Sequence, residues 1–239
     1  MTVDLFEVLE ATWPPVARVT KGVVTYRDGG GGGNRVSATT VSPGFEATDL
    51  DRLDQGPGGG AAPVMIRGAR DAALDLALTA RGYGIRDATL FYAAPCKDLA
   101  RPIPPLAGIL SDGPLAALNE VWTEGGIGAE RQAIMARAVG PKSWILGRHR
   151  DKAAGAAFVA LYQDTAMLHA IEVRPTERRN GVASALVARA ATWAQSKDAT
   201  TLILAVTEAN TGARSAYASL GMTVVGNYHY RTQPGPPLI

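Results

Sequence analysis

The stretch that most constrains the fold runs from residue 165 to 206. It reads TAMLHAIEV, then a turn with a proline and three arginines, then an alanine-rich segment and TLILAV. Val182, Leu186, Ala190 and Trp193 recur at the spacing of one helix face. A strand, a helix and a second strand in this order are typical of a crossover between parallel strands of one sheet. The sequence therefore predicts strands at 165–173 and 201–206, with a helix at 182–196 on one face of the sheet.

The residues around this crossover extend the same pattern. Strands are expected at 143–150, 153–162 and 224–231, and helices at 115–123, 129–138 and 211–219. Short polar turns between consecutive strands imply antiparallel pairing, whereas the crossovers imply a parallel portion. The pattern predicts an α/β (α+β) fold with a mixed sheet and helices on its faces.

The first half of the chain is less regular. A helix is expected at 4–11 and a strand at 16–27; Gly29 to Gly33 and a β-rich run at 34–41 follow. This favours a hairpin with a loose loop, because a phosphate-binding loop would need a helix directly after the glycines. After a flexible connection at 55–63 we expect a strand at 64–67, a helix at 69–81 and a strand at 87–94. The proline-rich residues 95–105 are interpreted as a linker, which divides the chain into domains 1–105 and 106–239.

Composition and charge exclude several classes of protein. The 239 residues have a net charge of +2, too small to indicate nucleic-acid binding. A single cysteine excludes an internal disulfide or a multi-cysteine zinc site, and the three histidines lack metal-ligand spacing. There is no basic, apolar leader and no run of ~18 apolar residues, so neither a secretory signal nor a membrane span is expected. We expect a cytoplasmic protein without a metal.

The turn before the helix at 182–196 has the features of an anion site. Arg178 and Arg179 supply forked donors suited to phosphate, and Gly181 lets a ligand approach the backbone. The helix that begins beyond it carries unsatisfied N–H groups and a partial positive charge. The alternative is an ordinary solvated turn between a strand and a helix.

Two motifs resemble those of the GNAT superfamily of N-acetyltransferases. Arg178, Gly181 and Ala183 fill its motif A, Arg/Gln-x-x-Gly-x-Gly/Ala, and NTGARSAYASLGM at 210–222 is similar to its motif B. The resemblance covers about residues 112–232. It implies a mostly antiparallel central sheet flanked by helices, and acetyl-CoA as co-substrate. The partner would be an amine-bearing small molecule or peptide, and the protein a monomer or homodimer.

The resemblance also implies roles for particular residues. Tyr217 would protonate the thiolate of coenzyme A, and a backbone N–H between Ile171 and Val173 would stabilise the oxyanion. The base that takes the proton of the amine is His169 or Glu172, or water carries that proton. Strict strand alternation would put His169 on the face of Ile171 and Val173, and Glu172 on the other. The residues expected to bind the cofactor are Ile171, Val173, Arg178, Arg179, Asn180, Gly181, Val182, Ala183, Asn210 and Ala213. Asn210 would bind the pantetheine arm, cap the helix at 211–219, or do both.

The first half contains a segment similar to motif B. GARDAALDLALTARGYGIRDATLFYAA and GARSAYASLGMTVVGNYHYR share a Gly-Ala-Arg start, a helical pattern, a glycine with a large apolar residue, and a strand. Leu78 stands where the second copy has Tyr217. We expect two tandem GNAT-like units, the first degenerate and without catalysis; chance similarity of two amphipathic helices is the alternative.

Three functions are compatible with these observations. The motifs favour an acetyl-CoA-dependent N-acetyltransferase in which a neutral amine attacks the thioester directly. A non-catalytic, acyl-CoA-binding regulatory module is the alternative, which the presence of Tyr217 disfavours. A nucleotide-binding domain is the third, but the chain has neither a Gly-Lys-Ser/Thr nor a GxGxxG pattern.

Overall fold

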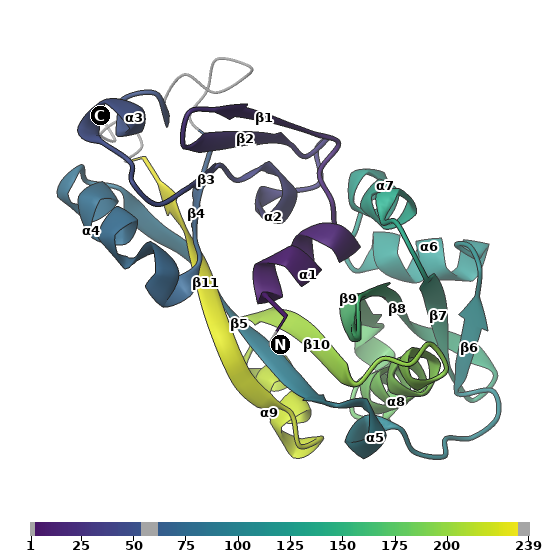
Figure 1. Cartoon of the computed structure of the whole chain (residues 1–239). Coiled ribbons are helices and arrows are strands. Elements are labelled where there is room, and N and C mark those ends of the chain that lie inside the picture. Colours follow the sequence, from purple (N-terminus) through teal and green to yellow (C-terminus); the bar gives the residue numbers. More distant parts are fainter. Residues whose placement is uncertain (1–2, 54–61, 234–239) are drawn as a thin grey trace.

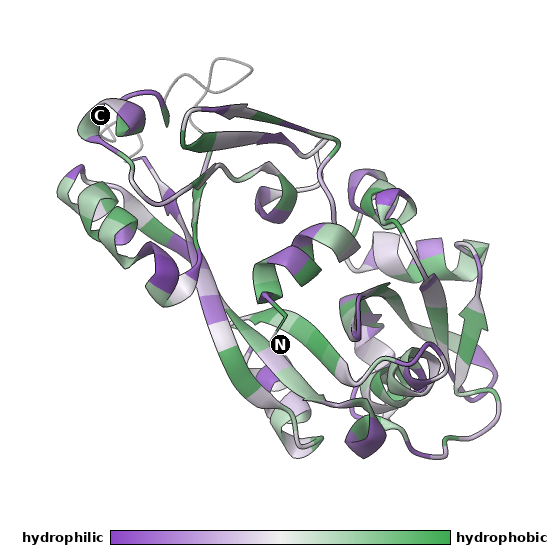
Figure 2. Ribbon diagram, viewed as in Figure 1, coloured by the Kyte–Doolittle hydropathy of each residue, from purple (hydrophilic) through white to green (hydrophobic). Residues whose placement is uncertain are grey.

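A mixed sheet of eight strands forms the centre of the molecule (Figure 1). The computed structural model describes residues 3–53 and 62–233. The strand order is β4-β11-β5-β10-β9-β8-β7-β6, and only β9 and β10 pair in parallel. Their bounds are β4 (Val64–Ile66), β5 (Gly84–Pro95), β6 (Gly108–Ser111), β7 (Lys142–His149), β8 (Lys152–Tyr162), β9 (Thr165–Val173), β10 (Thr201–Thr207) and β11 (Thr223–Thr232). The predicted mixed, mostly antiparallel sheet is confirmed. Of the two predicted crossovers, the one from β9 to β10 joins strands that pair in parallel, whereas β10 and β11 do not pair because β5 lies between them. In Figure 2 the ribbon of β10, in the middle of the sheet, is mainly hydrophobic, as expected for a strand covered on both faces.

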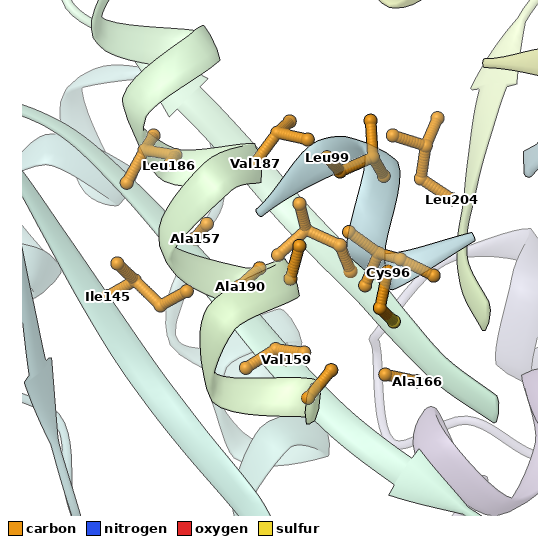
Figure 3. Packing of buried hydrophobic residues seen from close by; sticks show 14 of the residues in the cluster. Cys96, Leu99, Ile145, Ala157, Val159, Ala166, Leu186, Val187, Ala190 and Leu204 are labelled. Atoms are coloured by element: carbon orange, nitrogen blue, oxygen red, sulfur yellow. The ribbon is translucent and has the colours of Figure 1, made fainter. Parts of the chain in front are cut away.

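Helices cover both faces of this sheet. One face carries α5 (Cys96–Leu99), α8 (Val182–Gln195) and α9 (Thr211–Ser219). Figure 3 shows residues of α8, among them Leu186 and Ala190, packing on apolar side chains of β7 and β8. The other face carries α1 (Leu5–Thr12), α6 (Ala116–Glu124) and α7 (Ala129–Arg137) around a second apolar cluster. All four helical positions predicted to face the sheet, Val182, Leu186, Ala190 and Trp193, are buried.

The N-terminal part adds a small sheet of β1 (Ala17–Lys21), β2 (Val24–Asp28) and β3 (Thr40–Val41), with short helices α2 (Asn34–Ser37) and α3 (Ala47–Leu50). Two expectations were wrong here. The run at 16–27 is itself a hairpin, because Gly22 (φ 60°) turns the chain between β1 and β2. A single helical turn, α2, directly follows the glycines, and its Val36 is buried. The predicted pairing across the glycines does exist, between β2 and β3. The predicted connection at 55–63 falls mostly at 54–61, outside the described residues.

The proline-rich residues 95–105 are packed in their first part, whereas most of 101–105 is exposed. Cys96 and Leu99 of α5 are buried against α8, which an exposed linker would not allow (Figure 3). β6 follows at 108–111 and pairs with β7; its four residues were too few to give a sequence signal.

The two halves of the chain exchange strands in the central sheet. β5 from the first half lies between β10 and β11, and β11 from the second half lies between β4 and β5 (Figure 1). The order of these four strands is β4-β11-β5-β10. If β4 changes places with β10 and β5 with β11, the same order results, read from the other end. Helix α4 (Ala72–Ala80), which begins after a 3-10 turn at Gly68–Asp71, occupies in the first copy the place of α9 in the second.

The two helices end with the same hydrogen bond. The Tyr83 N–H donates to the Leu78 carbonyl at 3.0 Å, and the Met222 N–H donates to the Tyr217 carbonyl at 3.1 Å. In each case the preceding glycine, Gly82 or Gly221, is left-handed. This likeness supports the hypothesis of a repeat. The degenerate first unit and the division at residue 105 stay predictions. Within residues 3–53 and 62–233, no helix is both long and apolar enough to cross a membrane.

Candidate active site

The parallel strands β9 and β10 separate halfway along the sheet. Their pairing ends at Leu168 and Leu204, although β9 continues to Val173 and β10 to Thr207. A bulge marks this point: the β8–β9 register shifts between Ala156 and Phe158, and Ala170 has a positive φ of 50°. The indole N–H of Trp122 on α6 donates to the Ala170 carbonyl at 2.8 Å and so holds the bulge in place. The opening exposes one edge of β9 beyond Leu168 to a ligand.

The bulge makes the predicted side-chain alternation along β9 wrong. Leu168, Ile171 and Val173 all pack in the cluster around α8. His169 points to the opposite face, where it stacks on Trp13 with ring centroids 4.8 Å apart. Glu172 lies on that face too, because its side chain packs against Gly125 at the end of α6. The extra residue of the bulge therefore brings His169 and Glu172 to one side of the sheet.

The predicted anion turn connects β9 to α8. A 3-10 turn at Pro175–Glu177 leads to Arg178, Arg179 and the left-handed Gly181 (φ 78°), which is the N-cap of α8. No side chain caps this helix, and a β-carbon at Gly181 would meet nothing within 4 Å. Val182 is buried between Gly147 and Gly155, where larger residues would clash with it. The packing of Val182 on the sheet therefore fixes the start of α8, whereas the backbone at Gly181 stays accessible.

Basic side chains surround this open helix end. Arg178 is exposed; its guanidinium reaches the Val173 carbonyl at 3.2 Å and Glu172 at 3.5 Å. Asn180, Gly181, Val182 and Ser184 border a cavity of about 680 Å³, which the segment 101–107 and the β7–β8 turn close on the other sides. Arg101, which contacts the Ser184 hydroxyl, and Arg148 line it too. An uncapped helix N-terminus among arginines attracts anions.

Tyr217 lies at the inner end of the strand opening. It is only 6% exposed, and burial together with the nearby charge of Glu172 raises the pKa of its hydroxyl to about 12. The phenol is therefore protonated at neutral pH and able to donate. Asn210 caps α9, because its side-chain oxygen accepts the Ala213 N–H at 3.1 Å. Tyr217, Asn210, Ala213 and Ile171 line a second cavity of about 360 Å³.

His169 is buried in that second cavity's wall. Its Nε2 is 2.8 Å from the Thr12 hydroxyl of α1, and its Nδ1 has no hydrogen-bond partner among the described residues. Burial, and then the charge of Arg35, lower the pKa of His169 well below its ordinary value. The imidazole is neutral and a weak base.

The acidic residues near the break between α6 and α7 have structural partners. Arg174 holds Glu124 through two hydrogen bonds of 2.7 and 2.8 Å. Glu130 packs against Gly31 of the glycine run. In the part of the chain that the structure describes, no cluster of His, Cys, Asp and Glu could hold a metal ion.

Sequence reasoning missed one wall of the second cavity. Trp13, Asn34, Arg35, Asp87 and Thr89, all from the first half, line it together with Arg131 of α7. They lie far from the motifs in the sequence and share no spacing, so only the strand exchange and the packing of α1 and α2 bring them together.

Comparison with known proteins agrees with this geometry. Residues 111–222 match the model of the acetyltransferase (GNAT) family. No curated protein sequence matches the chain. Among solved structures, a GCN5-related N-acetyltransferase from Kribbella flavida is similar, with a TM-score of 0.68 and 18% identity over 98% of this chain and 96% of that one.

Two further structures share the fold. A GNAT-family acetyltransferase from Novosphingobium aromaticivorans has a TM-score of 0.59 and 14% identity over 94% and 95% of the two chains. A tandem GNAT protein from the clavulanic acid biosynthesis pathway has a TM-score of 0.62 and 14% identity, over 97% of this chain and 88% of that one. Residues 111–222 thus match the GNAT acetyltransferase family, and the fold of the chain is that of GNAT N-acetyltransferases.

Proposed function

We propose that the protein is an acetyl-CoA-dependent N-acetyltransferase that acetylates a primary amine. Two observations carry the proposal: the opening between β9 and β10, which the buried, protonated Tyr217 borders, and the uncapped N-terminus of α8, which follows β9 through a short turn. In this proposal a long ligand with an anionic centre and a reactive end spans the distance between them. The family of residues 111–222 supports acetyl-CoA as that ligand.

In this proposal the backbone amides around residues 180–183 bind the diphosphate of acetyl-CoA. Gly181 leaves room for close approach, and Arg178 and Arg179 add positive charge. The pantetheine arm then follows the free edge of β9 past Val173 and Ile171, as a strand would. Asn210 and Ala213 border its far side.

The reaction is direct attack of the neutral amine on the thioester carbon. The C–N bond forms, and a backbone N–H in the Ile171–Val173 segment stabilises the charge that develops on the carbonyl oxygen. When the C–S bond breaks, Tyr217 gives its proton to the thiolate. Tyr217 recovers a proton from solvent, and the proton lost by the amine goes to a base.

Glu172 is the better candidate for that base. The bulge turns Glu172 to the same face of the sheet as His169, and the charge of Glu172 raises the pKa of the Tyr217 hydroxyl. His169 has its Nε2 next to Thr12, and both burial and Arg35 oppose its protonation. A water between the amine and Glu172 would carry the proton.

The experiment is acetyl-CoA titration by calorimetry, followed by thiol release with a panel of primary amines. Binding with amine-dependent release of one thiol per acetylated amine supports the proposal. Binding without release with any amine would favour a non-catalytic acyl-CoA-binding module. No binding at all would refute both.

A further inference from the structure

The second cavity is lined by arginine side chains that the acetyl transfer itself does not require. It is lined by the β9–β10 opening and Tyr217 on one side, and by Trp13, Asn34 and Arg35 of the first half on the other. Its volume of about 360 Å³ is at the small end of ligand sites, which suits one small molecule next to the thioester. In the proposed arrangement the thioester of acetyl-CoA lies at Tyr217. The part of the second cavity beyond Tyr217 is then where the acceptor would bind.

The positively charged guanidinium of Arg35 lines this cavity without pairing with a carboxylate of the described residues. Its Nε donates to the Tyr228 hydroxyl at 3.0 Å, and within residues 3–53 and 62–233 it forms no ion pair. The neighbouring Tyr230 is no anion, since burial raises the pKa of its hydroxyl. The charge of Arg35 reaches His169, whose pKa it lowers. A half-buried guanidinium is costly unless an anion accompanies it.

On its other side, Arg35 borders a small cavity whose acidic residues are Asp4, Glu7 and Glu10. Two of these three carboxylates pair with other arginines. Glu10 pairs with Arg18 at 2.6 Å and with Arg27 at 2.9 Å. Asp4 pairs with Arg70 at 2.7 Å. Glu7 is exposed, and within the described residues it forms no ion pair with Arg35. None of the three carboxylates is therefore paired with Arg35.

A second guanidinium and one carboxylate complete the polar lining. The side chain of Arg131 forms no ion pair or hydrogen bond within the described part of the chain, and its Nη2 would be 3.4 Å from a β-carbon at Gly33. Asp87, held by the Asn34 amide at 3.3 Å, is the acidic residue of the lining. Two cations and one anion leave the cavity with a net positive charge, although an amine acceptor alone would favour a negative one.

We infer that the acceptor is a small amine that also carries an anionic group, and that Arg35 and Arg131 bind this group. The inference rests on the proposed acetyltransferase function. Arginine forks match carboxylates and phosphate-type anions. If the anionic group binds to the arginines, the amine of the same molecule faces Tyr217 and the thioester. Asp87 would bind the ammonium form of this amine before the amine loses its proton.

The test compares amines that differ only in the anionic group. Small α-, β- and γ-amino acids are assayed beside their carboxamides and their aminophosphonate counterparts, with rates expressed per unprotonated amine. The wild-type protein should prefer one of the anionic series over the carboxamides by about tenfold to a hundredfold in kcat/KM, the usual worth of a charged hydrogen bond. The preferred series identifies the anion.

Variants assign the preference to residues. Arg35→Gln and Arg131→Gln should each raise KM for the preferred anionic amine about tenfold or more, with little change for its carboxamide. Arg35→Lys should recover part of the loss. Arg86→Gln is the matched control, since it removes the same charge from an exposed residue outside the cavity and should change neither KM.

The outcomes separate this inference from the proposed function. Acetyl-CoA titration of every variant reports whether the fold and the cofactor site are intact. Wild-type protein that acetylates carboxamides as well as their anionic counterparts would overturn the inference and leave the acetyltransferase standing. Equal losses for both amines in Arg35→Gln and Arg131→Gln, with acetyl-CoA bound normally, would overturn it as well. Absence of acetyl-CoA binding by the wild type would overturn the proposed function, and this inference with it.

Discussion

Replacing Gly181 with valine separates the anion turn from the stability of the fold. Gly181 has a φ of 78°, and a β-carbon there would meet nothing within 4 Å. The folded protein therefore accepts the side chain without a clash. The cost is the left-handed backbone, about 1–2 kcal/mol for a residue other than glycine. For a chain of this length that corresponds to a fall in Tm of roughly 2–8 °C.

The loss of cofactor affinity should be larger than this strain explains. A valine side chain at Gly181 would stand where the diphosphate approaches the backbone amides. Losing one hydrogen bond to a charged group costs about 1.5–3 kcal/mol, which weakens Kd about tenfold to a hundredfold. Calorimetric titration with acetyl-CoA measures this directly.

Gly44→Val provides the matched control. Gly44 has a φ of 85° and equally open surroundings, but it lies in the first half, away from α8. It should lose a similar Tm and bind acetyl-CoA as the wild type does. If Gly181→Val binds acetyl-CoA as tightly as Gly44→Val, the diphosphate does not lie on this turn and the reasoning is refuted.

Three further predictions concern the interior of the site. Tyr217→Phe should lower kcat for thiol release and leave the Kd for acetyl-CoA nearly unchanged; an unaltered kcat would remove Tyr217 as the acid. Trp122→Phe removes the indole N–H that donates to the Ala170 carbonyl, so urea unfolding should show a loss of about 1–3 kcal/mol in the free energy of unfolding; a loss below about 0.5 kcal/mol would show that the indole does not hold the bulge. His169 stays neutral in the folded protein, whereas the unfolded chain takes up a proton below pH ~6.5. The free energy of unfolding should therefore fall by up to about 1.4 kcal/mol per pH unit below that value, and His169→Gln should remove this part of the slope. Identical pH slopes for both proteins would contradict the assigned burial.

The sequence was sufficient for the second half of the fold because its signals are local. The apolar spacing of α8, the apolar runs and length of β7 to β10, and the glycines before α8 and after α9 each depend on neighbours in the chain. For the same reason the short elements β6 and α2 were not predicted: each contains four residues, too few for a period to show.

The site could be predicted only where it coincides with those local signals. Gly181, Tyr217 and Asn210 lie in motifs. Tyr217 and Asn210 line the cavity at the opening between β9 and β10, and Gly181 borders the other cavity, at the start of α8. The side-chain directions on β9 could not be predicted, because the bulge at Ala170 depends on a hydrogen bond from Trp122, 48 residues away. Arg35 and Asp87 reach the cavity through strand exchange between the two halves, which no sequence window contains.

A crystal structure with a thioether analogue of acetyl-CoA tests the central claim most directly. We predict diphosphate oxygens within hydrogen-bond distance of the backbone N–H groups at residues 180–183, and the sulfur facing the Tyr217 hydroxyl in the gap beyond Leu168. An analogue bound elsewhere, with the start of α8 free of phosphate and its sulfur remote from Tyr217, would contradict the account.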